Sequence, residues 1–198
     1  EIAQSEAATG KPFSRFFMHV GYLNINNQKM SKSLGNFFTV RDILKSYEPE
    51  VLRFFMLSSH YRNPINFSQD LMEQAKNSLE RLYNGLYSME HLEKGALEKN
   101  LNEDQERYLQ KLNIYKKEFI EAMDDDFNTA DAIACLFNIV REYNMNINEK
   151  SPLKLIKETK ELLLDLGNVL GLFRKFSDET LLDEEIEQKI KERQEARK

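Results

Sequence analysis

Hydrophobic positions divide the chain into two regions with different patterns. Residues 68–172 place apolar side chains every three or four positions, which is the spacing of one buried face of an α-helix. Residues 1–67 show no sustained period of this kind and contain three of the four prolines. The pattern changes near Asn63-Pro64, because a residue before proline is disfavoured in the helical conformation. We therefore expect an irregular first region followed by a helical second region.

Four amphipathic helices are predicted in the second region. Ser68, Asn128 or Thr129, and Ser151-Pro152 are typical of helix starts, and Gly171 is typical of a helix end. The expected buried faces are Leu71, Ala75, Leu79, Leu82 and Leu86; Tyr108, Leu112, Tyr115, Phe119 and Ala122; Ile133, Leu136, Phe137 and Val140; and Ile156, Leu163, Leu166 and Leu170. Short connections favour antiparallel neighbours, so residues 68–176 are predicted to form an antiparallel four-helix bundle.

Short elements are predicted in the first region, and together they suggest a small mixed α/β unit. In order, they are a helix over Ile2 to Thr9 that ends at Gly10, extended chain over Phe16 to Ile25, a turn at Asn26-Asn27-Gln28, a helix from Thr39 to Lys45 with a capping box to Asp42, and a helix over Glu50 to Ser58 after Pro49. The predicted fold class is therefore mainly α, with a small mixed α/β connecting region before the bundle.

Composition limits the classes of protein that the chain can represent. Apolar residues make up 41% and charged residues 31%, and no run of about 18 apolar residues occurs, so we expect no membrane association. Residues 1–10 contain no basic segment followed by an apolar stretch, so no signal peptide is expected. Cys135 is the single cysteine, which excludes a disulfide within the chain and fits the reducing cytoplasm.

Charge is unevenly distributed along the chain, whose net charge is −5. Residues 1–67 hold eight basic and five acidic side chains, a net charge of +3. Residues 68–176 carry −5, and residues 177–198 carry −3 and are predicted to be a charged tail that starts a further element. Because steering of a charged ligand depends on the local field, the basic first region can still face phosphates.

One basic segment of the first region carries the strongest chemical signal. Residues 29–33 read Lys29-Met30-Ser31-Lys32-Ser33, and Gly35 follows two positions later. Two ammonium groups three residues apart, with hydroxyl groups beside them, can neutralise and bind a polyphosphate. A solvated basic turn is the ordinary alternative for a Lys/Ser loop. The five residues and their flanks match a specific signature, which makes that alternative the weaker one.

The segment resembles the KMSKS loop of class I aminoacyl-tRNA synthetases, and its flanks resemble cysteinyl-tRNA synthetases. The matching segments are Glu1 to Ala7, Asn24 to Asn27, Ser33 to Thr39, Tyr47 to Phe55, His60 to Arg62, Asn66 to Ser68, and Met123 to Thr129. The resemblance implies that residues 1–67 end a catalytic domain and form a stem-contact-like connecting region. It also implies that residues 68–176 form a tRNA-binding bundle on the anticodon side.

The resemblance further implies a cysteine–tRNA ligase, expected to be monomeric and cytoplasmic. Its substrates would be ATP with Mg, cysteine and the tRNA for cysteine. Lys32 and Lys29 would stabilise the departing pyrophosphate, and Met30, Ser31 and Ser33 would complete the ATP-phosphate site. We expect this chain alone to be inactive, because it contains no His-x-Gly-His nucleotide-binding segment.

A zinc ligand is also implied at Glu1. The related enzymes carry a run His-His-Glu-Asn-Glu-Ile-Ala-Gln, whose first histidine and last glutamate bind zinc, and Glu1 matches that glutamate. Zinc with an open position could bind the substrate thiolate and so favour cysteine over serine. The other ligands are absent from this sequence, so zinc is expected only in the complete enzyme.

Three alternatives remain open from the sequence. A related ligase joins cysteine to an amino sugar with the same adenylate chemistry and needs no tRNA. A synthetase for another amino acid is disfavoured by the flanks of the loop. A non-catalytic helical RNA-binding or interaction module is the third alternative. We expect His60, Tyr61 and Arg62 to lie either at a domain junction or near tRNA phosphates.

Overall fold

The described part of the chain, residues 1–31 and 38–176 of a computed structural model, is mainly helical with one small sheet. Its elements are α1 (Ile2–Thr9), β1 (Leu23–Ile25), β2 (Gln28–Lys29), α2 (Val40–Ile43), α3 (Pro49–Leu57), β3 (Ile65–Phe67), α4 (Gln69–Gly95), α5 (Glu103–Asp124), α6 (Thr129–Asn146) and α7 (Leu153–Val169). None of the helices described is long and apolar enough to cross a membrane.

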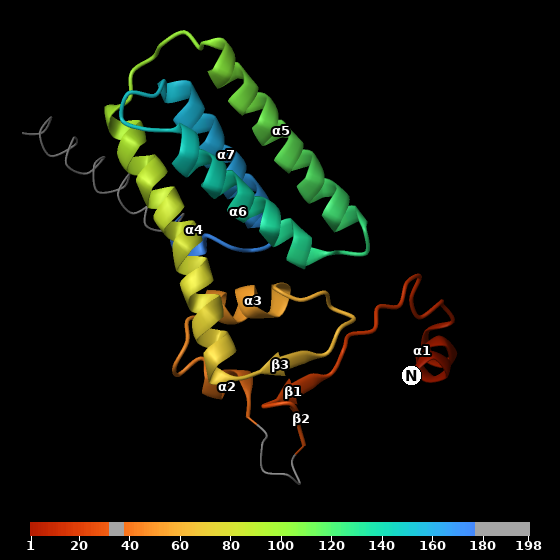
Figure 1. Cartoon of the computed structure of the whole chain (residues 1–198). Coiled ribbons are helices and arrows are strands. Elements are labelled where there is room, and N and C mark those ends of the chain that lie inside the picture. Colours follow the sequence, from red (N-terminus) through yellow and green to blue (C-terminus); the bar gives the residue numbers. More distant parts are fainter. Residues whose placement is uncertain (32–37, 177–198) are drawn as a thin grey trace, which may run out of the picture.

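Helices α4 to α7 form an antiparallel bundle in which successive helices run in opposite directions (Figure 1). The sheet, α2 and α3 lie at one end of this bundle, and α1 stands apart from it. This arrangement confirms the predicted fold class. The proposed division into residues 1–67, 68–176 and 177–198 stays a prediction, and residues 177–198 lie outside the described part.

Three of the predicted helix starts carry the expected side-chain cap, whereas α7 follows Pro152 without one. The side chain of Ser68 accepts a hydrogen bond from the Leu71 backbone N–H, and Asn128 caps α6 in the same way. Thr39 and Asp42 form the expected capping box. These caps satisfy N–H groups that have no partner within the first turn of a helix.

One hydrophobic core runs through the bundle and continues into α3. Buried side chains of α4 to α7 include the predicted faces, although Leu71, Ala122 and Phe137 lie at its edge and are half-buried. Val51, Phe54 and Phe55 of α3 belong to the same core. The connecting region and the bundle therefore share one packed interior.

The small sheet has the order β2-β1-β3, with β1 antiparallel to β2 and parallel to β3. Strand β3 was not predicted, because three residues after a proline carry no alternating pattern. Only Leu23–Ile25 of the predicted extended segment becomes a strand, since only these residues meet β3. Gly21 permits that approach, because a Cβ there would overlap the Asn63 carbonyl group.

Candidate functional site

The segment with the lysines leaves the sheet through a tight hairpin. Asn26 and Asn27 have φ angles of 48° and 63°, and Ile25 pairs with Gln28 across the turn. A two-residue hairpin loop with both φ angles positive matches the right-handed twist of its strands, and asparagine tolerates this conformation well. The hairpin therefore delivers Lys29 at the last position of β2.

Strand β3 holds this hairpin from the side. The Asn27 backbone N–H donates to Asn66 Oδ1 over 2.7 Å, and the Asn26 N–H donates to the Phe67 carbonyl oxygen over 3.1 Å. Both bonds join residues about 40 positions apart in the sequence. The tip of the hairpin is thereby fixed relative to the start of α4, which follows β3 directly.

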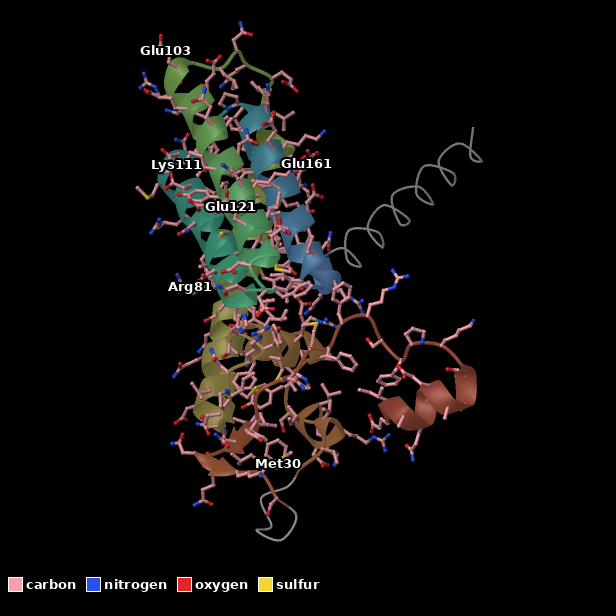
Figure 2. The ribbon with its side chains drawn as sticks, turned by 90° about the vertical axis from the view of Figure 1, so that its right-hand side faces the viewer. Met30, Arg81, Glu103, Lys111, Glu121 and Glu161 are labelled. Atoms are coloured by element: carbon pink, nitrogen blue, oxygen red, sulfur yellow. The ribbon has the colours of Figure 1, made fainter. Side chains whose placement is uncertain are left out.

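Lys29, Met30 and Ser31 are the part of the predicted phosphate site that the structure describes. Lys29 is exposed, and its Nζ lies 5.3 Å from the centre of the Tyr22 ring. Figure 2 shows Met30 near one end of the molecule and Glu103, at the start of α5, at the opposite end. Lys32 and Ser33 lie outside the described residues, so their predicted roles are not tested here.

The chain after this segment is anchored to the same strand. The centre of the Phe38 ring lies 4.6 Å from the centre of the Phe67 ring. The Phe67 ring centre in turn lies 5.9 Å from that of Phe55 in α3. Hydrogen bonds from Lys45 and then Thr39 lower the pKa of Asp42 well below its usual range. Residues on both sides of positions 32–37 therefore contact β3.

A polar cluster connects the connecting region to the loop between α5 and α6. The Tyr61 hydroxyl donates to Asp126 Oδ1 over 2.7 Å, and Arg62 Nε lies 2.8 Å from Asp126 Oδ2. His60 stacks on the Tyr61 ring, and its Nε2 lies 3.7 Å from Asp126 Oδ2. The hydrogen bond to Tyr61, followed by the charge of Asp126, raises the pKa of Arg62. We call His60, Tyr61, Arg62 and Asp126 the Asp126 cluster.

Two further contacts fix α3 on the bundle. Glu50, in the first turn of α3, accepts a hydrogen bond from the Tyr83 hydroxyl over 2.9 Å and one from the Phe173 backbone N–H over 2.6 Å. Burial, followed by the Glu50 contact, raises the pKa of Tyr83. The Thr129 hydroxyl donates to the Leu57 carbonyl oxygen over 2.7 Å. Each end of α3 is therefore tied to the bundle.

The predicted zinc ligand Glu1 precedes α1 and is exposed, without a hydrogen bond from its side chain to the helix start. Over residues 1–31 and 38–176, no group of three His, Cys, Asp or Glu side chains could hold a metal ion. Glu1 alone does not make a zinc site, so we derive no step of the chemistry through zinc.

Cys135 is buried in α6, and this burial raises the pKa of its thiol.

Comparison with known proteins finds a match to a protein family in the first and in the last part of the described chain. Residues 1–77 match the family described as tRNA synthetases class I (C) catalytic domain, and residues 118–174 match the DALR domain family. The chain therefore contains a region similar to a class I tRNA synthetase catalytic domain, followed by a region similar to a DALR domain. Lys29, Met30 and Ser31 lie within the synthetase match, and α6 and α7 lie within the DALR match.

A solved structure has a similar fold. It is the ternary complex of a LeuRS from Agrobacterium radiobacter with tRNA and LeuAMS. The similarity has a TM-score of 0.62 at 20% sequence identity and covers 77% of this chain and 22% of that chain. The chain thus spans about a fifth of the length of that LeuRS, and at this identity the likeness concerns the fold.

The polar contacts described above join the two regions of the chain that match these families. His60, Tyr61 and Arg62 lie in the synthetase match, and their partner Asp126 lies in the DALR match. Glu50 and Phe173 form a second link of the same kind. Sequence reasoning left His60 to Arg62 either at a domain junction or near tRNA phosphates, and the contact with Asp126 favours the junction. It missed the partner residues Asp126 and Glu50, because nothing local in the sequence indicates a partner 65 or 123 residues away.

Proposed function

We propose that this chain is part of a cysteine–tRNA ligase, in which residues 29–33 bind the ATP phosphates and the helical bundle binds the tRNA for cysteine. The observation that carries the proposal is the position of Lys29 to Ser31. These residues leave an exposed hairpin inside the class I match, and the strand that holds the hairpin leads directly into α4. The match to a family described with the letter C and the flanks of the loop support cysteine as the amino acid.

The proposed reaction has two steps. The cysteine carboxylate attacks the α-phosphate of ATP, the bond to the β-phosphate breaks, and pyrophosphate leaves with the electron pair. The terminal adenosine hydroxyl of the tRNA then attacks the adenylate carbonyl, and AMP leaves. In the first step, Lys29 and Lys32 neutralise charge on the departing phosphates, because phosphoryl transfer depends mainly on positioning and electrostatic stabilisation.

Lys32→Ala in the protein with its full catalytic domain tests the phosphate role. A hydrogen bond to a charged group contributes about 1.5–3 kcal/mol, and about 1.4 kcal/mol corresponds to tenfold in rate. We expect cysteine-dependent ATP–pyrophosphate exchange to slow by about ten- to a few hundred-fold, with the binding of cysteine nearly unchanged. An exchange rate equal to that of the unsubstituted enzyme would remove Lys32 from the mechanism.

Exchange with different amino acids tests the substrate. We expect cysteine to support exchange, and serine and leucine to support little. Leucine as the better substrate would overturn the assignment and favour the amino acid named for the LeuRS neighbour.

The amino-sugar ligase is the second candidate, and it shares the first step. The DALR match and the tRNA in the neighbouring structure favour the tRNA enzyme. Transfer of labelled cysteine to tRNA, compared with transfer to a glucosamine-containing acceptor, separates the two. Acylation of the sugar alone would replace the present proposal.

A further inference from the structure

A polar groove runs between α4 and α6 on the surface of the bundle. It has a volume of about 730 Å³, and its polar lining comes from Ser78, Arg81, Asn84, Asn138, Arg141 and Asn144. At a rise of about 1.5 Å per residue, the lining segments of both helices extend roughly 10 Å. That length corresponds to roughly three nucleotides along one nucleic-acid strand.

The floor of the groove explains its shape. A Cβ at Gly85 would lie 3.0 Å from Val140 Cγ1, so α4 and α6 approach closely at this point. Gly85 and Val140 are both buried, whereas Arg81 and Arg141 are exposed above them. The close approach therefore leaves a hollow with an apolar floor and a polar rim.

The charge of the rim differs from that of the rest of the bundle. No carboxylate lines the groove, and in residues 1–31 and 38–176 neither Arg81 nor Arg141 forms an ion pair. Basic side chains on the outer faces of α5 and α7 have acidic partners one helical turn away, at Arg107–Glu103, Lys117–Glu121 and Lys157–Glu161. Figure 2 shows Arg81 projecting from α4, away from Glu121 and Glu161.

The polar side chains of the rim have unused hydrogen-bonding capacity. Across the described residues, no intramolecular hydrogen bond engages the side chains of Ser78, Asn84, Asn138 or Asn144, all of which line the groove. The Arg81 guanidinium lies 5.5 Å from the centre of the Phe137 ring, which orients it at the rim. The groove thus presents the exposed guanidinium groups of Arg81 and Arg141 beside neutral hydrogen-bond donors and acceptors.

We propose that this groove binds the sugar-phosphate backbone of RNA, with Arg81 and Arg141 on phosphates and the asparagines on ribose hydroxyls and phosphate oxygens. The planar guanidinium matches phosphate geometry, and amide groups can both donate to and accept from a 2′-hydroxyl. Residues 68–176 carry a net charge of −5, so a polyanion is repelled by much of this surface and binds where carboxylates are absent. The inference rests on the proposed function, which supplies tRNA as the RNA.

The test uses Arg81→Gln with Arg141→Gln in the protein with its full catalytic domain. Binding of the tRNA for cysteine is measured over a range of salt concentrations. We expect affinity to fall by about 10- to 100-fold at low salt, and the slope of log K against log salt to decrease in magnitude by about 2. ATP–pyrophosphate exchange without tRNA is expected to stay unchanged, because the groove takes no part in adenylate formation.

The matched control is Arg107→Gln with Lys117→Gln, which removes the same charge from α5. We expect this control to change the slope by less than half as much, since each side chain already faces a carboxylate. Arg141→Gln alone is the second variant, because Arg141 makes no aromatic contact that supports packing among the described residues. It should reduce the slope by about 1.

The outcomes separate the two proposals. An unsubstituted protein that shows neither cysteine-dependent exchange nor tRNA binding overturns the proposed function and this inference with it. A protein that charges tRNA normally, while the double variant keeps its affinity and slope, overturns the groove alone. A phosphorylated peptide that binds as tightly as tRNA and loses affinity in the same variant would replace RNA as the ligand.

Discussion

At the scale of single residues, the buried carboxylate of Glu142 shows how this bundle accommodates charge. Glu142 is 5% exposed, and its Oε1 accepts hydrogen bonds from Lys111 Nζ over 2.7 Å and from the Tyr115 hydroxyl over 3.2 Å. The hydrogen bond from Lys111 lowers the pKa of Glu142. The carboxylate is therefore more stable in its charged form in the folded protein than in the unfolded chain.

The first prediction concerns Glu142→Gln. We expect the free energy of unfolding at pH 7 to fall by roughly 1–3 kcal/mol, because Lys111 and Tyr115 lose a charged acceptor. The pKa of Glu142 is lower in the folded protein than in the unfolded chain, where it is about 4.3. The carboxylate therefore stabilises the fold above the unfolded value, and this stabilisation is lost as the pH falls through the folded value. Urea unfolding at pH 7 and at pH 3 measures both effects.

The control for this prediction is Glu161→Gln, which breaks the exposed pair with Lys157. We expect that change to cost less than about 1 kcal/mol. A Glu142→Gln variant whose destabilisation is the same at both pH values would show that the charge does not matter.

At the scale of elements, the end of α7 depends on one small residue. A Cβ at Gly167 would overlap the ring of Phe173, which is fully buried just beyond the helix. Phe173 itself has a φ of 68°, and its N–H is held by Glu50. The chain after α7 thus folds back over Gly167 and closes the core against α3 and α4.

The second prediction compares two glycines in helices. We expect Gly167→Ala to lower the free energy of unfolding by about 1–3 kcal/mol, because the ring of Phe173 must shift within a packed core. We expect Gly95→Ala, at the end of α4, to be neutral or stabilising by up to about 1 kcal/mol, since a Cβ there meets nothing within 4 Å. Thermal unfolding of both variants measures the contrast, and equal effects would contradict it.

The third prediction concerns the hairpin before the lysine segment. Asn66→Ala removes the acceptor of the Asn27 N–H, so we expect that amide to exchange its hydrogen faster. The Asn26 N–H bonds to the backbone oxygen of Phe67 and should keep its protection. Hydrogen exchange followed by NMR reports both amides, and unchanged exchange at Asn27 would mean that Asn66 does not hold the turn.

At the scale of the whole molecule, the segment that bears Lys29 and the helical bundle form one connected body. The hairpin bonds to β3, Phe67 of β3 packs on α3, and α3 is tied to α4, α6 and the turn after α7 (Figure 1). The Asp126 cluster adds a link at the loop between α5 and α6. Such a connection fixes the segment that bears Lys29 relative to the bundle, as the proposed roles of the two parts require.

The fourth prediction tests this connection with Asp126→Ala. We expect a loss of roughly 1–3 kcal/mol in the free energy of unfolding, and faster hydrogen exchange at residues 58–62, because Tyr61 and Arg62 lose their shared acceptor. Asp125→Ala is the matched control in the same acidic run, and it should stay within about 0.5 kcal/mol. Equal effects of the two substitutions would show that the cluster does not join the regions.

The sequence alone determined the features that depend on neighbours along the chain. The four long helices, their caps at Ser68 and Asn128, and the capping box at Thr39 follow from spacings of three or four residues. A second capping box at Asn102 and Gln105 has the same local signature and could have been predicted. The resemblance of the lysine segment to the KMSKS loop also rests on a few consecutive residues, and its phosphate-binding role stays a prediction.

Only the tertiary structure decided which distant residues meet. Strand β3 exists because it pairs with β1 about 40 residues earlier, and Asp126 and Glu50 have partners 65 and 123 residues away. The groove between α4 and α6 likewise depends on the packing of Gly85 against Val140. Local propensity specifies hydrogen bonds within one turn, whereas contacts across the core depend on how all the helices pack together.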